Sequence, residues 1–256
     1  MVRMARGLLA AWHFLTVLRL PGAPATRLDD LRCALPFFPL VGVVLGGMLA
    51  LLDAPLGLLF GRPLRDLIML SLLVLMSGGL HLDGLVDTAD GLFLDGSWEE
   101  RLAAMHESRA GPRGAITALC LLLLGYSAIA ALPDGSRLPG LVLAPTLGRW
   151  TVVVGYVVFP YARRGPGVSA ALKAGAGPAA LLTASMLAVA AGLLLCWPSG
   201  AVLLAGAGAF VFAAGHFASR RLGGMSGDVY GAVEQIVEVG VLAAVPLLSC
   251  ERLTLG

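Results

Sequence analysis

The sequence predicts an all-α protein, a polytopic membrane helical bundle with about seven transmembrane helices, within a range of six to eight. Of its 256 residues, 58% are hydrophobic and only 13% are charged, and the mean hydropathy is +0.87. A soluble domain carries about 25% charged residues, so this chain has too few charges to solvate a surface of its size. Its apolar residues come in long runs without amphipathic spacing, which favours the lipid bilayer as solvent.

Seven apolar runs approach the length of about 20 residues that a spanning helix needs. They cover residues 34–52, 67–82, 114–132, 139–160, 179–197, 201–218 and 236–250. The second and the last are short, so we expect them to be tilted or partly re-entrant. Residues 6–18 form an interfacial helix or an eighth membrane segment. The turn at 197–200, with sequence WPSG, predicts a tight helical hairpin over 179–218.

The distribution of basic residues predicts a cytoplasmic N-terminus. With this orientation most of the 18 Lys and Arg residues lie inside, as the positive-inside rule requires. The same choice places the polar segments 83–113, 161–178 and 219–235 on the cytoplasmic face of a single membrane-embedded catalytic domain, residues 1–256. We therefore expect a multi-pass protein of a bacterial inner membrane. A net charge of +2 is too small to suggest a nucleic-acid partner.

The four cysteines predict no special chemistry. They lie far apart, in or beside apolar runs, at Cys33, Cys120, Cys196 and Cys250. Because no CxxC pair exists, a zinc or redox site is not expected. We interpret all four as small apolar packing residues.

An aspartate-rich segment follows the second apolar run. Asp83, Asp87 and Asp90 stand at positions i, i+4 and i+7, within roughly 60° of one another on a helix. Like charges so placed repel unless a cation lies among them, and Mg²⁺ prefers a few carboxylates together with substrate phosphates. We therefore predict that these three aspartates bind Mg²⁺. Gly84 and Gly91 lie beside this stripe, where a missing side chain would admit a bulky substrate.

Other interpretations of this segment stay open. Asp-Gly pairs also mark turns, so residues 83–96 can be read as a solvated loop. An EF-hand is excluded, because its alternating acids and terminal glutamate are missing. His81 projects to the far side of the predicted helix, either as a functional residue or as a polar residue at the membrane interface.

Three arginines are candidates for binding phosphate. Arg109 and Arg113 lie in a small-residue loop suited to holding phosphate oxygens, although a basic loop that only sets topology fits as well. Arg149 lies within an apolar run, where an arginine is costly and faces a cavity or an acid. It is therefore a functional residue or one half of a structural ion pair.

The third polar segment combines glycines with acids. The glycines around Gly224 predict a loop whose backbone N–H groups face an anion. Asp228 follows as a candidate metal or hydroxyl ligand. Glu234 and Glu238 then stand four residues apart at the start of the last span.

These motifs, in this order, resemble the cobalamin synthase family, the adenosylcobinamide-GDP ribazoletransferases. The likeness covers nearly the whole chain. The segments that carry it are FLT at 14–16, FFPLVG at 37–42, GLHLDG at 79–84, SRAG at 108–111, GRW at 148–150 and GGMSGDVYGA at 223–232. The family typically has Lys-Asp before Ser-Arg, where this chain has His106-Glu107. Glu107 keeps the carboxylate and is expected to bind substrate, whereas no role of the lysine passes to His106.

The resemblance implies a reaction and its participants. A hydroxyl of α-ribazole, or of its 5′-phosphate, attacks the phosphate that joins cobinamide to GMP, and GMP leaves. Phosphoryl transfer needs charge neutralisation and positioning. The three aspartates would supply Mg²⁺, with one as a base, and Arg109 and Arg149 would hold the pyrophosphate. The amphiphilic corrinoid would occupy a groove at the membrane edge, and a homo-oligomer stays open.

Two other functions are alternatives to this interpretation. A CDP-alcohol phosphotransferase also uses aspartates at a helix end, but its pattern continues Asp-Gly-x-x-Ala-Arg, whereas Leu85-Val86-Asp87-Thr88 follows here. A secondary transporter would place its ionisable residues near the bilayer midplane. In this sequence, the charges gather mainly on one face.

Overall fold

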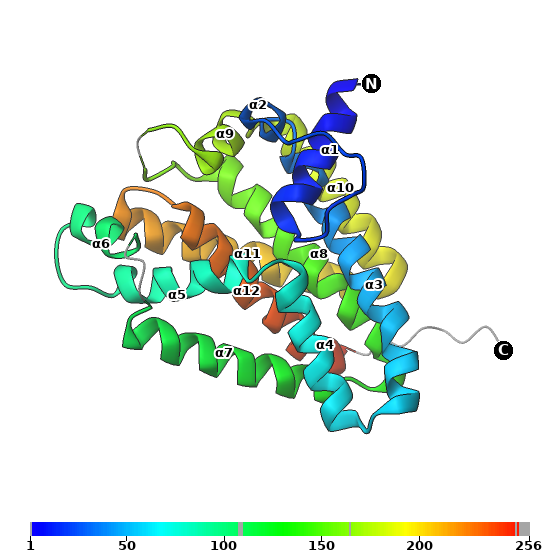
Figure 1. The fold of residues 1–256 in the computed structure, drawn as a ribbon. Coiled ribbons are helices and arrows are strands. Elements are labelled where there is room, and N and C mark those ends of the chain that lie inside the picture. Colours follow the sequence, from blue (N-terminus) through cyan, green and yellow to red (C-terminus); the bar gives the residue numbers. More distant parts are fainter. Residues whose placement is uncertain (1, 107–109, 164, 249, 251–256) are drawn as a thin grey trace.

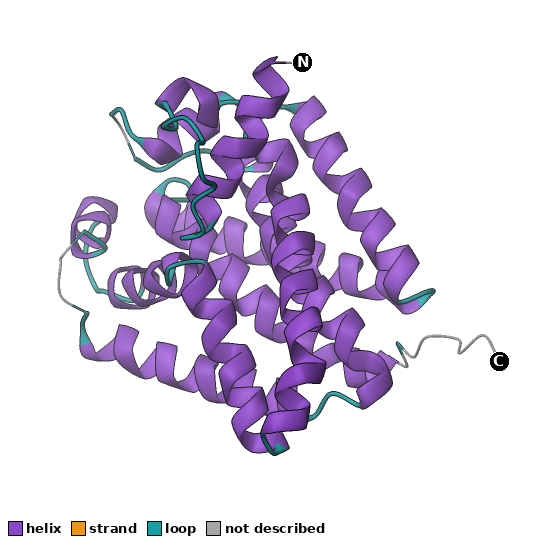
Figure 2. Ribbon diagram, turned by 45° about the vertical axis from the view of Figure 1, so that its right-hand side comes forward, coloured by secondary structure: helices purple, strands orange, loops and turns teal. Residues whose placement is uncertain are grey.

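The computed structural model describes residues 2–106, 110–163, 165–248 and 250, and its regular elements are helices (Figure 1). The α-helices are α1 Val2–Leu15, α2 Leu28–Leu31, α3 Phe38–Leu59, α4 Arg62–Met76, α5 Leu80–Leu92, α6 Trp98–Ala104, α7 Pro112–Ala130, α8 Asp134–Val158, α9 Val168–Ala174, α10 Pro178–Leu195, α11 Ser199–Leu222 and α12 Gly227–Ala244. Two short 3₁₀ helices, η1 Leu35–Phe37 and η2 Val245–Leu248, complete them. Figure 2 shows helices packed on all sides of the molecule, joined by short loops.

The membrane-spanning helices confirm the predicted fold class. Within the described residues, six helices are long and apolar enough to cross a bilayer, and a seventh span results if α4 and α5 are counted as one. α4 and α5 meet at an angle of 83°. The bend is possible because Gly78 and Gly79 adopt positive φ angles of 66° and 71°, which glycine reaches without steric cost. The expected span 67–82 is therefore a broken helix. α1 has only 14 residues, which is short for a span.

The last span begins earlier than its apolar run. The candidate span covers Gly227–Leu248, whereas the hydropathy pattern predicts residues 236–250. The difference arises because Glu234, which precedes the apolar run, is buried against His81 and Arg149 inside the bundle. Sequence hydropathy counts Glu234 as a break, although its charge is compensated within the protein.

α8 is the central helix of the bundle, and it packs against α3 and α12. Within its most apolar window, 83% of the residues are buried. Gly42 and Gly46 of α3 allow close contact, because a Cβ at Gly42 would lie 2.6 Å from Thr146 Cα and one at Gly46 would lie 2.5 Å from Val142 Cα. Small residues at such crossings are typical of packed membrane helices.

A buried charge cluster joins α3, α4 and α8 near the turn between α3 and α4. Arg137 Nη2 lies 2.6 Å from Asp53 Oδ1 and 2.7 Å from Asp66 Oδ1. The Arg137 side chain is only 4% exposed. Arg137 and Arg65 thus act as ion-pair partners between helices.

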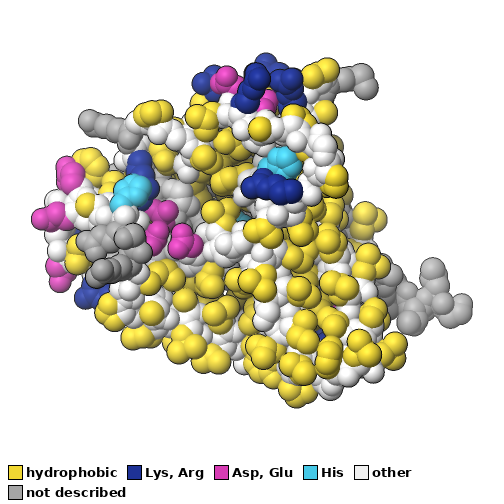
Figure 3. All heavy atoms as spheres, viewed as in Figure 1, with side chains coloured by type: hydrophobic (Ala, Val, Ile, Leu, Met, Phe, Trp, Pro, Cys, Tyr) yellow, Lys and Arg dark blue, Asp and Glu magenta, His cyan; other side chains and the backbone are white. Residues whose placement is uncertain are grey.

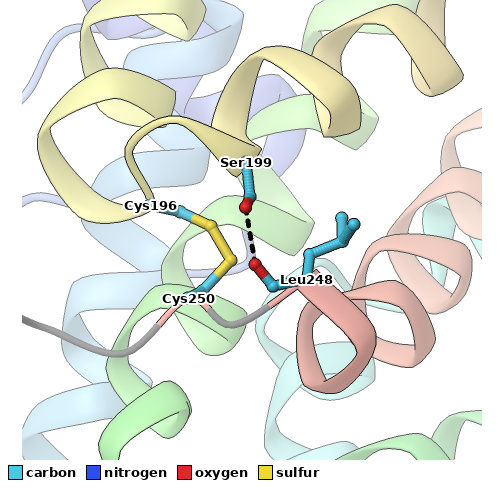
Figure 4. Close-up of a disulfide and its surroundings, with 4 residues drawn as sticks. All are labelled: Cys196, Ser199, Leu248 and Cys250. Carbon is cyan, nitrogen blue, oxygen red and sulfur yellow. Dashed lines mark hydrogen bonds between the residues drawn. A yellow bond between two sulfur atoms is a disulfide. The ribbon is translucent and has the colours of Figure 1, made fainter.

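Cys196 and Cys250 form a disulfide, so the expectation of four unbonded cysteines is wrong for this pair (Figure 4). Their Cα atoms lie 4.7 Å apart, and Ser199 Oγ donates a hydrogen bond of 2.5 Å to the Leu248 carbonyl beside them. The disulfide joins the loop after α10 to the end of the last span. Cys33 and Cys120 are free.

The surface separates polar from apolar side chains. In Figure 3 most of the visible acidic side chains lie at the left, where Figure 1 places α5 and α6, and basic side chains gather at the top near α1 and α2, with a few acidic ones among them. Hydrophobic side chains cover the lower surface, over α4 and α7. This distribution agrees with a multi-pass membrane protein that carries its charged surface at one end.

Candidate active site

The aspartate segment is helical, as predicted. It forms α5, which packs against α12 and α7. α5 and α12 cross at Gly84, where a Cβ would lie 2.8 Å from the Asp228 carbonyl oxygen. Gly91 lies equally close to α6, since a Cβ there would lie 2.6 Å from the Arg101 carbonyl oxygen. These two glycines therefore serve helix packing, and Gly84 also lies in the wall of a cavity beside Asp83. The expectation that they admit substrate stays a prediction.

Of the three aspartates of α5, Asp83 and Asp87 have carboxylates that remain available to bind a ligand. Asp83 is exposed and Asp87 is half-buried. Neither side chain makes a hydrogen bond or ion pair with another described residue. The Asp87 carboxylate lies within electrostatic range of Asp83, Asp228 and Arg163. Two acids four residues apart, with a third on the neighbouring helix, leave this point strongly negative.

Asp90 differs from the other two aspartates. Its Oδ2 accepts a hydrogen bond of 2.6 Å from the Gly111 N–H, and its Oδ1 accepts one of 2.8 Å from the Gly114 N–H. These donors belong to the first turn of α7, where helical N–H groups lack partners within the helix. The carboxylate therefore caps α7 and joins it to α5.

The donor set suits Mg²⁺ that is completed by substrate and water. Among the described residues, no group of three or more His, Cys, Asp or Glu side chains is arranged to hold a metal ion alone. Mg²⁺ is commonly bound by one or two carboxylates plus phosphate oxygens, which is what Asp83 and Asp87 offer. The residues present therefore fit a metal that binds together with a phosphorylated substrate.

A buried charge network lies behind the aspartates. Glu234 is fully buried, and its carboxylate lies 2.9 Å from His81 Nδ1 and 2.9 Å from Arg149 Nη1. Arg149 also contacts Glu238 at 3.3 Å and donates to the Pro145 carbonyl oxygen. The network joins α5, α8 and α12. It favours the ion-pair interpretation of Arg149, and it places His81 on the far side of α5 as predicted.

The glycine-rich segment pairs with another part of the chain. The Met225 N–H donates to the Pro160 carbonyl at 2.9 Å, and the Ala162 N–H donates to the Met225 carbonyl at 2.9 Å. A Cβ at Gly224 would lie 2.9 Å from the Ala162 nitrogen. Gly224 thus permits this backbone pairing, and the Met225 N–H is taken up by it. The Met225 N–H is therefore not free to bind an anion, and anion binding by the other N–H groups of this loop stays a prediction.

Asp228 lies at the start of α12 beside a residue that the sequence analysis did not select. Arg163 Nη2 lies 2.6 Å from Asp228 Oδ2, and Arg163 Nη1 lies 3.4 Å from His106 Nδ1. In the sequence, Arg163 is one of several basic residues in a polar loop, which indicated topology alone. The backbone pairing of residues 160–162 with Met225 brings Arg163 into contact with Asp228, and this pairing has no local signal in the sequence.

The remaining predicted residues lie near the end of α5 or outside the described residues. Arg113 is exposed in the first turn of α7, and its Nη1 donates to the Phe93 carbonyl at 3.3 Å. Glu107 and Arg109 fall in 107–109, outside the described residues. Their substrate-binding and catalytic roles remain predictions.

A cavity of about 320 Å³ opens next to the aspartates. Asp83 and Asp228 lie in its wall, and its aromatic lining includes Phe14, Tyr156 and Tyr230. The ring centroids of Tyr156 and Tyr230 lie 3.9 Å apart, with the ring planes tilted by 31°. A more open groove of about 800 Å³ shares Phe14 and Asp83 with this cavity and extends along α1 to the bend between α4 and α5.

Comparison with known proteins places the chain in a family. A family model described as cobalamin-5-phosphate synthase matches residues 7–246. The chain belongs to the cobalamin-5-phosphate synthase family. A relative from Roseiflexus sp. (strain RS-1), named adenosylcobinamide-GDP ribazoletransferase, is 35% identical over 95% of this chain and 90% of its own length.

Two further relatives of this chain carry the same name. The one from Pseudomonas savastanoi pv. phaseolicola is 41% identical over 90% of this chain and 94% of its own length. The one from Pseudomonas fluorescens is 41% identical over 93% and 97%. No solved structure matches the chain. The family resemblance inferred from the sequence motifs is thus confirmed.

Proposed function

We propose that this protein joins α-ribazole, or its 5′-phosphate, to adenosylcobinamide-GDP in a Mg²⁺-dependent transfer that releases GMP. The proposal is carried by one observation: Asp83, whose carboxylate has no partner among the described residues, lies in the wall of an aromatic-lined cavity, one helical turn before Asp87, in a chain of this family. Membership of the family and the names of its relatives support the choice of substrates.

The reaction replaces a phosphoanhydride bond by a phosphate ester bond. A ribose hydroxyl oxygen attacks the phosphorus attached to cobinamide, and the bond from that phosphorus to the bridging oxygen of GMP breaks. The electron pair leaves with GMP, and the hydroxyl proton passes to a carboxylate or to water. Mg²⁺ bound by Asp83 and Asp87 would neutralise charge on the phosphates. Asp90 would act mainly by fixing α7 against α5, and Arg109 would supply further positive charge.

The cavity and the open groove suit different parts of the substrates. A space of about 320 Å³ lined by Phe14, Tyr156 and Tyr230 fits a flat aromatic base. A corrinoid is larger and amphiphilic, and the open groove of about 800 Å³ between α1 and the α4–α5 bend offers it both apolar and polar side chains. We therefore assign the ribazole base to the cavity and the corrinoid to the groove.

We further propose that the aspartate end faces the cytoplasm of a bacterial inner membrane. The excess of basic residues in the polar segments supports this orientation. The disulfide between Cys196 and Cys250 lies at the other ends of α10 and α12, and disulfides persist in oxidising compartments such as the periplasm.

An activity assay tests this proposal. The purified protein in liposomes is incubated with adenosylcobinamide-GDP, Mg²⁺ and either α-ribazole or its 5′-phosphate. We expect a corrinoid product of the joined mass and one GMP for each product formed. Absence of both products with folded protein would reject the proposal, and turnover of a CDP-alcohol instead would favour the competing phosphotransferase.

A further inference from the structure

Arg163 is a cation that the fold holds at the aspartate site. It directly follows the backbone pairing of Pro160 and Ala162 with Met225, which fixes its position relative to the first turn of α12. Its side chain is 19% exposed, and its Nη2 lies 2.6 Å from Asp228 Oδ2. The backbone of Arg163 is thus held in place by the pairing beside it, and its side chain is partly accessible.

The guanidinium of Arg163 has unused hydrogen-bonding capacity. Of its five N–H donors, one bonds Asp228 and another faces His106 Nδ1 at the long distance of 3.4 Å. The buried Nε has no partner among the described residues. A buried donor without a partner is costly, so a ligand that accepts from it would be favoured. Planar guanidinium groups bind phosphate oxygens in pairs, which suits such an arrangement.

The surroundings of Arg163 identify the kind of ligand. Asp228 lines the cavity together with Asp83, and Asp87 lies within electrostatic range of both Asp228 and Arg163. A phosphorylated ligand that meets a metal at Asp83 and Asp87 would therefore approach the guanidinium as well. Mg²⁺ and arginine are complementary in this setting, because each neutralises different oxygens of a diphosphate.

We infer that Arg163 is a substrate-binding residue that pairs with Asp228 and binds the leaving GMP phosphate during transfer. The inference rests on the proposed function and adds a residue to its site. As the bond between phosphorus and the bridging oxygen breaks, the negative charge that develops on GMP would be neutralised by the guanidinium. Asp228 would serve as its resting partner and orient it toward the cavity.

Inhibition by GMP and by guanosine distinguishes this role from a purely structural one. We expect GMP to inhibit wild-type turnover more strongly than guanosine. Arg163→Gln should weaken inhibition by GMP by about 10- to 100-fold and leave inhibition by guanosine unchanged, because only GMP carries the phosphate. Arg163→Lys should retain part of the preference for GMP. A purely structural role would weaken both inhibitors alike.

Arg220→Gln is the matched control. Arg220 is exposed in the last turn of α11, at the same end of the bundle, so its loss changes the net charge equally. Unchanged inhibition by GMP in Arg163→Gln, or equal loss for GMP and guanosine, would overturn the inference. A wild-type protein without transferase activity would instead reject the proposed function. Residual activity of Arg163→Gln, measured on protein with wild-type thermal stability, keeps the test valid.

Discussion

Arg149 Nη1 donates a hydrogen bond of 2.9 Å to Glu234 Oε1, at a point where both side chains are buried between α8 and α12. Glu234 also contacts His81 of α5, directly behind the aspartates. The ion pair therefore connects the central helix of the bundle to the helix that carries the candidate site. Its disruption would act on catalysis through the position of α5.

Replacement of Arg149 by methionine tests this connection. The change keeps a long side chain but leaves the buried carboxylates of Glu234 and Glu238 without their cation. Breaking one side of a buried ion pair costs about 3–5 kcal/mol, so the variant should unfold at markedly lower temperature. Thermal unfolding in detergent measures the loss. A variant as stable as wild type that has lost all activity would instead indicate direct contact of Arg149 with the substrate.

Asp90→Ala should affect stability more than the neighbouring aspartates do. The Asp90 carboxylate caps α7 through the Gly111 and Gly114 N–H groups, and loss of a helix cap costs about 0.5–2 kcal/mol. Asp83→Ala removes an exposed carboxylate without a described partner and should leave the unfolding temperature unchanged. Parallel thermal unfolding of both variants measures the difference. Equal stability of the two would contradict the capping role.

Gly84→Ala should disturb the crossing of α5 and α12. An added Cβ would lie 2.8 Å from the Asp228 carbonyl oxygen, so the helices must separate, at a cost of about 1–3 kcal/mol. Gly240→Ala in α12 is the control, because nothing lies within 4 Å of a Cβ there. We expect reduced stability and turnover for the first variant and no loss for the second. Comparable stability of both would show that the crossing tolerates the methyl group.

The disulfide gives a prediction about stability and compartment. Cys250→Ser should lower the free energy of unfolding by about 2–4 kcal/mol and leave turnover of the folded protein intact. Cys196→Ser should do the same. In intact cells a membrane-impermeant reductant should make Cys196 available for alkylation, whereas Cys33 should stay protected. Labelling of Cys196 only after cell lysis would reverse the proposed orientation.

Much of the fold could be predicted from the sequence, because each apolar segment can be recognised from its own residues without knowledge of its partners in the fold. The seven membrane segments, the α10–α11 hairpin and the helical aspartate stripe follow from run length and spacing. The break between α4 and α5 could not be predicted, since it depends on the backbone conformation of Gly78 and Gly79. The early start of α12 was missed because compensation of Glu234 requires Arg149, 85 residues away.

The candidate site was only partly accessible to sequence reasoning. The i, i+4 spacing places Asp83 and Asp87 together without knowledge of other helices. The capping role of Asp90 depends on where α7 begins, which its own segment does not reveal. The contact between Arg163 and Asp228 depends on the pairing of two distant loops. The pairing of Cys196 with Cys250 also has no local signal, because 54 residues separate them.

The most direct test of the central claim is turnover of adenosylcobinamide-GDP across a Mg²⁺ titration, with wild type, Asp83→Asn and Asp87→Asn. Asparagine keeps the shape of each side chain and removes its charge. We expect wild-type activity to vanish in EDTA and return with Mg²⁺, and each variant to lose about 100-fold or more at saturating Mg²⁺. The combined loss in the double variant should be less than additive, because the ligands act as a unit. Near-normal rates in both single variants, or undiminished wild-type activity in excess EDTA, would contradict the metal-dependent mechanism.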